Sequence, residues 1–551
     1  MTPSRRVLIV GGVAGGASCA ARLRRLDETL EIVVFDRGPY VSFANCGLPY
    51  YVGNVIQDEA KLLVASPQLF AERFNIEVRT FHNVVEIDRE AREITVENTQ
   101  TGTVSREKYD ILVLSPGAAP LRPPLPGLDL PGVFSLRTIP DSRQIREWLD
   151  TRPMERAAVI GGGFIGLEMA ENLAHRGLQV SLIEAAPQVM PPLDAEMAAY
   201  VEEHLRAKGV DLHLADPVAQ VEQKDGHLRV HTQSGATVDA GIVILAIGVR
   251  PESDLARAAG LELGERGAIR VDAQMRTSDP AIFAVGDAVE MTDSLTGEPV
   301  FVPLAGPANR QGRIAADVIC GRDSRFRGVQ GTAVCGVFGQ TVAMTGCTEK
   351  ALKRLRKTDF EVIFLHPGHH VGYYPGSKPI HLKLIYERPT GRVLGAQAVG
   401  AHGVERRIDV ISMAIQMGGT VFDLEESELC YAPQYGAAKD PVNVAGMIAA
   451  NTLRGDKILA GWEEDPGEAL FLDVREPAEF ARGHLPGAVN VPLSQLRERF
   501  VELPKDREIR VNCGVGQRSY YAVRFLRQNG YDARNLSGGF QTWQAFQQVK
   551  K

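Results

Sequence analysis

Several common features are missing from this sequence of 551 residues. Its seven cysteines form no Cys-x-x-Cys pair, so neither a disulfide framework nor a zinc site is indicated. No apolar run is long enough to span a bilayer, and the run after Arg6 breaks into glycine too early for a signal peptide. A net charge of −7 gives no electrostatic case for nucleic acid or an anionic membrane. These absences predict a cytoplasmic protein with neither kind of partner.

The N-terminus has the pattern of a dinucleotide-binding unit. Residues 7–10 predict a buried strand, 17–26 a helix, and 31–35 a second strand that ends in an acid. Glycines in the intervening loop let a pyrophosphate approach the helix N-terminus, although Val13 stands where a full G-x-G-x-x-G motif has glycine. The residues expected to bind this cofactor are Gly11, Gly12, Ala14, Gly15, Gly16, Asp36 and Arg37.

A second unit of the same kind begins near residue 157. A strand over 157–160 leads into Gly161-Gly162-Gly163-Phe164-Ile165-Gly166, and a helix over 167–176 and a strand over 180–183 follow. Two such units mean two cofactors, with Gly161, Gly163 and Gly166 at the second. Glu184 closes the pattern and should bind a ribose 2′-hydroxyl, which favours NADH and leaves NADPH as the alternative.

Three further apolar strands end in small or acidic residues: Ser115 follows the first, Gly248 the second, and Asp287 the third. In this order the motifs resemble the flavoprotein disulfide reductases that carry two dinucleotide sites. The resemblance implies that the first loop and Ser115 bind FAD and that Asp287 binds its ribityl chain. It also implies that the second loop and Gly248 bind the nicotinamide nucleotide.

Cys46 has no second cysteine nearby, and Tyr51 stands where a redox pair would place one. The stretch Ser42-Phe43-Ala44-Asn45-Cys46-Gly47-Leu48-Pro49-Tyr50-Tyr51 resembles coenzyme A disulfide reductases, and the likeness extends over about the first 450 residues. It implies that Cys46 reacts with an external thiol partner, CoA, and that the protein is a homodimer. The implied CoA-binding residues are Arg22, Arg25, Ser42, Asn45 and, from the other subunit, Lys439. Tyr373 and Tyr431 are the implied proton donors that enter the partner's active site.

Cys513 begins the loop Cys513-Gly514-Val515-Gly516-Gln517-Arg518-Ser519. The last ninety or so residues resemble a single-domain rhodanese. That likeness implies that the loop aims backbone N–H groups at the sulfur and stabilises a persulfide anion, with Arg518 adding positive charge. The remaining cysteines lack such contexts, and the histidines at 366, 369 and 370 lack a carboxylate or thiol in a ligand pattern, so no metal is expected.

The expected fold class is α/β, with two Rossmann-like domains, an α+β dimerisation domain and a C-terminal rhodanese domain. The FAD-binding domain is predicted over 1–150 and 265–327, and the NAD-binding domain over 151–264. The dimerisation domain should cover 328–452, a linker 453–465, and the rhodanese domain 466–551.

The combination resembles the CoA disulfide reductase–rhodanese fusion family, also described as NADH-dependent persulfide or polysulfide reductases. The expected activity is NADH-dependent reduction of CoA persulfide or polysulfide to thiol and sulfide through Cys46. Alternatives are CoA disulfide reduction as the main role and a redox or sulfur-relay sensor with slow turnover. NADH oxidase or peroxidase activity is disfavoured because those relatives carry histidine where this chain has Ala14.

Overall fold

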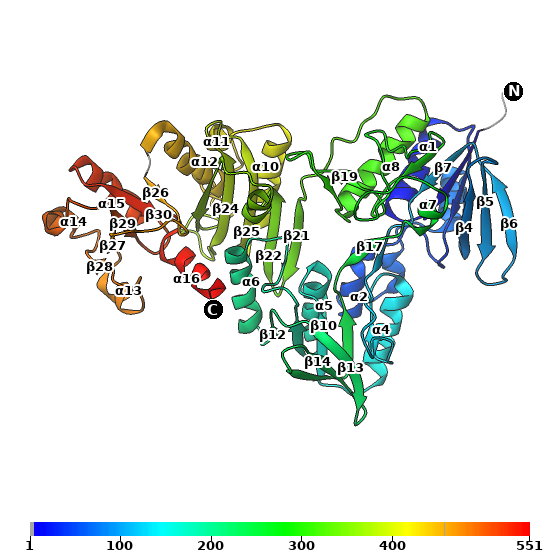
Figure 1. Cartoon of the computed structure of the whole chain (residues 1–551), viewed down its shortest axis with the longest axis horizontal. Coiled ribbons are helices and arrows are strands. Elements are labelled where there is room, and N and C mark those ends of the chain that lie inside the picture. Colours follow the sequence, from blue (N-terminus) through cyan, green and yellow to red (C-terminus); the bar gives the residue numbers. More distant parts are fainter. Residues whose placement is uncertain (1–4, 457, 551) are drawn as a thin grey trace. The chain divides into compact units, whose positions relative to one another are not determined.

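The computed structural model describes residues 5–456 and 458–550, which separate into two compact units. The first contains the described residues up to 185 together with 215–329, and the second contains 186–214 and those from 330 onward (Figure 1). Among the described residues, no helix has both the length and the apolar character that a membrane crossing requires.

The first unit contains a parallel sheet with the strand order β18–β7–β1–β2–β3. The predicted strands at 7–10 and 31–35 are confirmed as β1 (Arg6–Val10) and β2 (Glu31–Phe35). β7 (Ile111–Leu114) and β18 (Ile282–Ala284) lie on the other side of β1, and β3 (Glu77–Arg79) is the far edge. Because β18 returns to this sheet after the second dinucleotide unit, the segment containing Asp287 lies at the carboxyl edge of the first.

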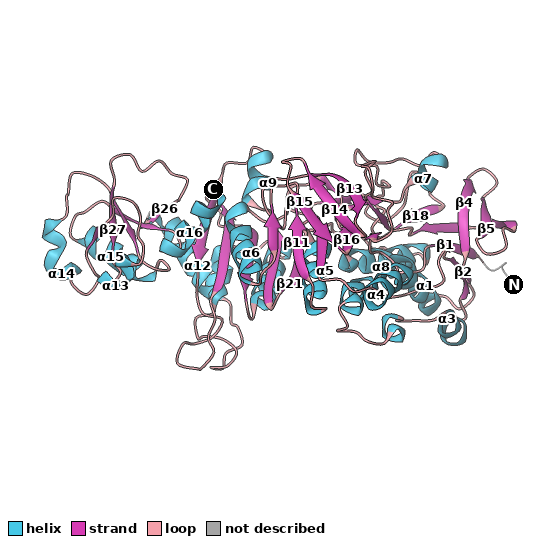
Figure 2. Cartoon of the chain, turned by 90° about the horizontal axis from the view of Figure 1, so that it is seen from below, coloured by secondary structure: helices cyan, strands magenta, loops and turns pink. Residues whose placement is uncertain are grey.

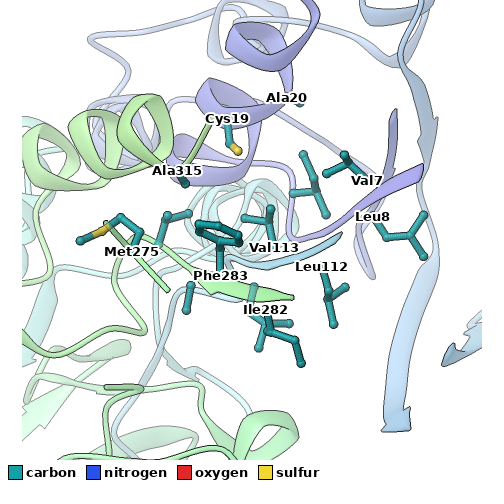
Figure 3. Packing of buried hydrophobic residues seen from close by; sticks show 14 of the residues in the cluster. Val7, Leu8, Cys19, Ala20, Leu112, Val113, Met275, Ile282, Phe283 and Ala315 are labelled. Atoms are coloured by element: carbon teal, nitrogen blue, oxygen red, sulfur yellow. The ribbon is translucent and has the colours of Figure 1, made fainter. Parts of the chain in front are cut away.

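Helices α1 (Ala14–Leu26) and α8 (Ala305–Ile319) pack beside this sheet. Figure 3 shows Phe283 and Val113, from neighbouring strands, at the centre of the core, with Cys19 of α1 close to α8. Cys19 is fully buried, as expected for a core cysteine. α1 begins three residues earlier than predicted, so Gly15 and Gly16 lie in its first turn.

A second parallel sheet has β11 (Gln179–Ile183), β10 (Arg156–Ile160), β16 (Ile242–Leu245) and β9 (Val133–Phe134) in that order. Helix α5 (Phe164–His175) follows β10 and confirms the predicted strand–loop–helix pattern. Two antiparallel three-stranded sheets complete this unit: β4 (His82–Asp88), β5 (Glu93–Asn98) and β6 (Val104–Lys108), and β13 (Val218–Lys224), β14 (His227–Thr232) and β15 (Thr237–Ala240).

The second unit contains the predicted α+β region. Its antiparallel sheet runs in the order β21 (Ala333–Val337), β22 (Gln340–Gly346), β25 (Val393–Gly400), β24 (Ile380–Glu387) and β23 (Phe360–Leu365). Helices α10 (Val404–Gln416) and α12 (Pro441–Asn451) follow in the chain.

Helix α6 (Ala195–Ala207) belongs to the second unit, although the predicted NAD-binding range of 151–264 includes it. The reason is a buried charge cluster. Lys383 is fully buried and its ammonium group binds Asp194 at 2.8 Å, Glu349 at 2.7 Å, and Glu196. Because a buried charge needs paired partners, this cluster fixes α6 to β24.

The C-terminal part is a parallel sheet with the order β26–β30–β29–β27–β28, flanked by helices (Figure 2). Its strands are β26 (Leu459–Ala460), β27 (Leu470–Asp473), β28 (Val489–Asn490), β29 (Ile509–Asn512) and β30 (Ala533–Leu536). Its helices include α13 (Pro477–Ala481), α15 (Gln517–Gln528) and α16 (Gly539–Val549). The predicted linker over 453–465 contains β26, which pairs with β30, so this sheet begins before residue 466. Residues 1–4, 457 and 551, which the predicted ranges include, lie outside the described residues.

Candidate active site

The two glycine loops share one tight packing arrangement. A Cβ added at Gly16 would lie 1.9 Å from the carbonyl oxygen of Gly11, and one at Gly166 would lie 1.8 Å from that of Gly161. Both of these oxygen atoms belong to the backbone and cannot rotate away, so only glycine lets each helix begin this close to its loop. A Cβ at Gly163 would meet nothing within 4 Å.

The acid after each second strand binds its own loop. The N–H of Gly12 donates to Oδ2 of Asp36 at 3.1 Å, and the N–H of Gly162 donates to Oε2 of Glu184 at 2.6 Å. Burial raises the pKa of Asp36. The two predicted acids therefore hold equivalent positions, where an acid can also bind a ribose hydroxyl. Arg37 instead pairs with Glu252 at 2.7 Å.

Asp287 and its surroundings fit a flavin cofactor. Burial raises the pKa of Asp287 to about 6, and its Oδ1 is buried with no hydrogen-bond partner within the described residues. Such an atom is costly until a donor reaches it, and the ribityl chain of FAD is a row of hydroxyl donors. Ser115 lies close by, because a Cβ at the neighbouring Gly286 would be 3.5 Å from the Ser115 hydroxyl oxygen.

Cys46 lies on a segment tied to the first loop. The N–H of Ser42 donates to the carbonyl of Gly12 at 2.7 Å, and Ser42 has a left-handed φ of 49°. Asn45 and Cys46 then form an exposed turn (Asn45–Gly47) directly before helix α2 (Leu48–Val52). Cys46 forms no disulfide. The hydrogen bond between Ser42 and Gly12 thus holds the segment with the exposed Cys46 thiol beside the predicted flavin loop.

Glu168, which lies outside every motif predicted from the sequence, influences Cys46. Surrounding protein atoms partly desolvate the Cys46 thiol and raise its pKa, although the residue keeps exposed surface, and the charges of Glu168 and Asp287 raise the pKa further. Glu168 lies on α5, where the Tyr50 hydroxyl donates to its Oε1 at 3.3 Å. Burial also raises the pKa of Glu168. A lone acid in the apolar start of α5, two residues after Gly166, was the available signal.

We expect Glu168→Gln to speed alkylation of Cys46 about two- to fivefold near neutral pH. Removing the carboxylate lowers the pKa of the thiol, and the thiolate is the reactive form. The measurement is iodoacetamide labelling of the Cys46 peptide across the pH range, where the profile should move to lower pH. Glu155→Gln, an exposed site before β10, is the control and should leave it unchanged. An unmoved profile in Glu168→Gln would contradict this account.

The basic residues predicted to bind CoA differ in whether their charge is already paired and whether they are exposed. The guanidinium of Arg22 is paired with Asp317 at 2.8 Å, so a phosphate would have to compete with that carboxylate. Arg25, one turn later on α1, is exposed. In the second unit, Lys439 is exposed immediately before Asp440, the N-cap of α12.

Tyr373 and Tyr431 come together as an exposed pair. Their hydroxyl oxygens lie 2.8 Å apart, and their relative exposures are 75% and 46%. The hydrogen bond with Tyr431 raises the pKa of Tyr373. One of two linked phenols can give a proton to a leaving group, and the other can then donate a hydrogen bond to the phenolate that remains.

Cys513 lies in a cradle at the start of α15. Its sulfur accepts hydrogen bonds from the N–H of Gly516 at 3.2 Å and the hydroxyl of Ser519 at 3.3 Å. Gly516 has a φ of 92°, which turns its N–H toward the sulfur. Unlike Cys46, Cys513 is only 1% exposed.

Arg518 lies beside this cradle, but its charge is balanced. It makes two hydrogen bonds of 2.7 Å to the carboxylate of Glu479 on α13, and these lower the pKa of Glu479 to about 2. The Glu479 carboxylate in turn raises the pKa of Arg518, and the nearby Cys513 sulfur raises it further. The ion pair therefore leaves less net positive charge at the loop than Arg518 alone suggested.

Comparison with known families agrees with this arrangement. Residues 5–312 match the pyridine nucleotide-disulphide oxidoreductase family, 332–440 match the dimerisation domain of the same family, and 458–546 match the rhodanese-like domain. The chain therefore belongs to the pyridine nucleotide-disulphide oxidoreductases, as an FAD- and NAD(H)-dependent enzyme with a fused rhodanese domain. The predicted fold class is confirmed.

Individual proteins similar to this chain show which members of the family it resembles. The reduced Bacillus anthracis CoADR-RHD is 47% identical, covers 98% of both chains and has a TM-score of 0.96. The NAD-dependent persulfide reductase from A. fulgidus is 38% identical over 98% of this chain and 100% of its own, with a TM-score of 0.91. Coenzyme A disulfide reductase of Staphylococcus epidermidis is 36% identical over 81% of this chain and 99% of its own. The family resemblance predicted from the sequence is confirmed.

Proposed function

We propose that this protein is an NADH-dependent reductase of sulfane sulfur, which converts CoA persulfide or polysulfide to thiol and sulfide. The observation that carries the proposal is the exposed, unpaired Cys46 beside the flavin loop, in a chain with a second cradled thiol, Cys513. Bound FAD supplies two-electron transfer between NADH and sulfur.

The residues divide the reaction between them. The Cys46 thiolate attacks the outer sulfur of a CoA persulfide, which breaks the substrate S–S bond, releases CoA thiolate and leaves a persulfide on Cys46. Two electrons, originating from NADH, then cleave the S–S bond of the protonated Cys46 persulfide, which regenerates the Cys46 thiolate and releases hydrosulfide. The exposed Tyr373–Tyr431 pair supplies the proton to the leaving group across a homodimer interface. Arg25 and Lys439, both exposed cations, are the proposed contacts for CoA phosphates, together with Arg22 once it leaves Asp317.

A second candidate is CoA disulfide reduction, which the relationship to the Staphylococcus enzyme favours. The deciding experiment is anaerobic NADH oxidation with polysulfide, CoA persulfide and CoA disulfide side by side, with sulfide release followed in parallel. Fast turnover with sulfide from the first two supports the proposal. Turnover on CoA disulfide alone makes the rhodanese domain an accessory, and no turnover on any substrate favours a sensor.

Cys513→Ser should separate the two substrate classes. We expect turnover on polysulfide to fall at least about tenfold, because serine cannot carry a sulfane sulfur. Turnover on CoA disulfide should stay within about twofold, since that reaction needs only Cys46. The two rates, measured on one preparation, control for each other. Equal losses on both substrates would overturn the proposed division of labour.

A further inference from the structure

Hydrogen bonds join the antiparallel sheet that contains β23 and β24 to the first turn of rhodanese helix α16. This sheet and its helices are called the reductase part of the second unit below. The N–H of Phe364 on β23 donates to the Ser537 hydroxyl at 2.9 Å, just before α16. Nε2 of His366 lies 2.7 Å from Oγ1 of Thr542, and both residues are buried. The turn that begins α16 is therefore held on one side by the reductase part.

The opposite side of the same turn holds the Cys513 loop. The N–H of Phe540 donates to the carbonyl of Cys513 at 2.7 Å, and the N–H of Gln541 donates to that of Gly514 at 3.0 Å. A Cβ at Gly539 would lie 2.4 Å from the Cys513 carbonyl oxygen, so loop and helix have no room to slide. A shift of α16 must reach the loop whose Gly516 N–H binds the sulfur.

The position of His366 is itself determined by buried neighbours. Its Nδ1 lies 3.0 Å from Nδ1 of His381. The His381 ring stacks on the Tyr200 ring, with 4.0 Å between the ring centroids. Only one of two facing Nδ1 atoms can carry a hydrogen, so both rings cannot be cationic without repulsion. Burial lowers the pKa of His366 well below its usual value and that of His381 to about 4. His366 thus presents a neutral, oriented imidazole to Thr542.

We propose that His366 is a positioning residue for Cys513, acting through Thr542 and the first turn of α16. The inference rests on the proposed sulfur-carrying role of Cys513. It means that the reductase part sets the geometry of the N–H groups around the sulfur of the neighbouring domain.

The test uses full-length protein with Cys46→Ser, and iodoacetamide labelling of the Cys513 peptide is followed by mass spectrometry. Thr542→Val removes the hydroxyl at similar volume and should slow labelling about three- to tenfold, because loosened N–H donors stabilise the thiolate less. Thr542→Ser retains the hydroxyl and should restore the rate to within about twofold. His366→Leu should match Thr542→Val, and the double variant should lose no more than either single one, because both act along one path.

Additive losses, or a lower melting temperature in Thr542→Val with an unchanged labelling rate of Cys513, would overturn the proposal. Labelling does not require sulfur turnover. A failure of the sulfur-carrying role, seen as full polysulfide turnover in Cys513→Ser, is therefore distinguishable from a failure of the positioning role.

Discussion

Cys46→Ser should lower NADH-dependent reduction of both CoA persulfide and CoA disulfide by at least about 10³-fold. Serine cannot form the S–S bond through which either substrate is cleaved, and its hydroxyl is not ionised near neutral pH. No other cysteine shares the Cys46 segment, so no thiol nearby in sequence can replace it. The measurement is anaerobic NADH oxidation at saturating acceptor.

The control is Cys320→Ser, at the C-terminal end of α8 and outside the proposed chemistry. It should retain full turnover. Flavin content must be equal in both variants, so that lost activity reports the sulfur and not the cofactor. Turnover by Cys46→Ser within about tenfold of the unaltered protein would exclude Cys46 as the essential nucleophile.

Gly16→Val should yield protein without bound flavin. A Cβ at residue 16 would lie 1.9 Å from the Gly11 carbonyl oxygen, and the conflict is with backbone that no side-chain rotation relieves. The loop must therefore move away from α1 and lose the close approach that a pyrophosphate requires. The readout is visible flavin absorbance per chain, with NADH oxidation expected to disappear in parallel.

Gly336→Ala is the matched control, because a Cβ at Gly336 on β21 meets nothing within 4 Å. It should bind flavin fully. A full flavin content in Gly16→Val would show that the first loop tolerates the displacement and would remove it as the proposed FAD pyrophosphate site.

The two dinucleotide units could be predicted because their signals are local. The glycines, strand and closing acid all fall within about thirty residues, and helix and sheet periodicities identify the elements between them. Glu168 was missed because its influence on Cys46 requires α5 to pack against α2. That packing brings together residues more than a hundred positions apart, as the Tyr50–Glu168 hydrogen bond shows.

Ion pairs between residues far apart in the sequence could not be predicted for the same reason. Arg518 and Arg22 are basic residues in suitable motifs, but only the folded chain gives the first Glu479 and the second Asp317 as partners. Domain limits are similarly non-local. α6 joins the second unit through Lys383, a residue far beyond the second dinucleotide motif.

The short strand β26 has a practical consequence for anyone isolating the C-terminal domain. A fragment cut at residue 466 would leave β30 as an uncovered sheet edge, since β26 is its outer neighbour. It would also lose Trp462, whose indole N–H donates to the Ser537 carbonyl at 2.6 Å. Exposed edges recruit strands from other chains, so such a fragment should self-associate through β30. A cut before Leu459 avoids the artefact.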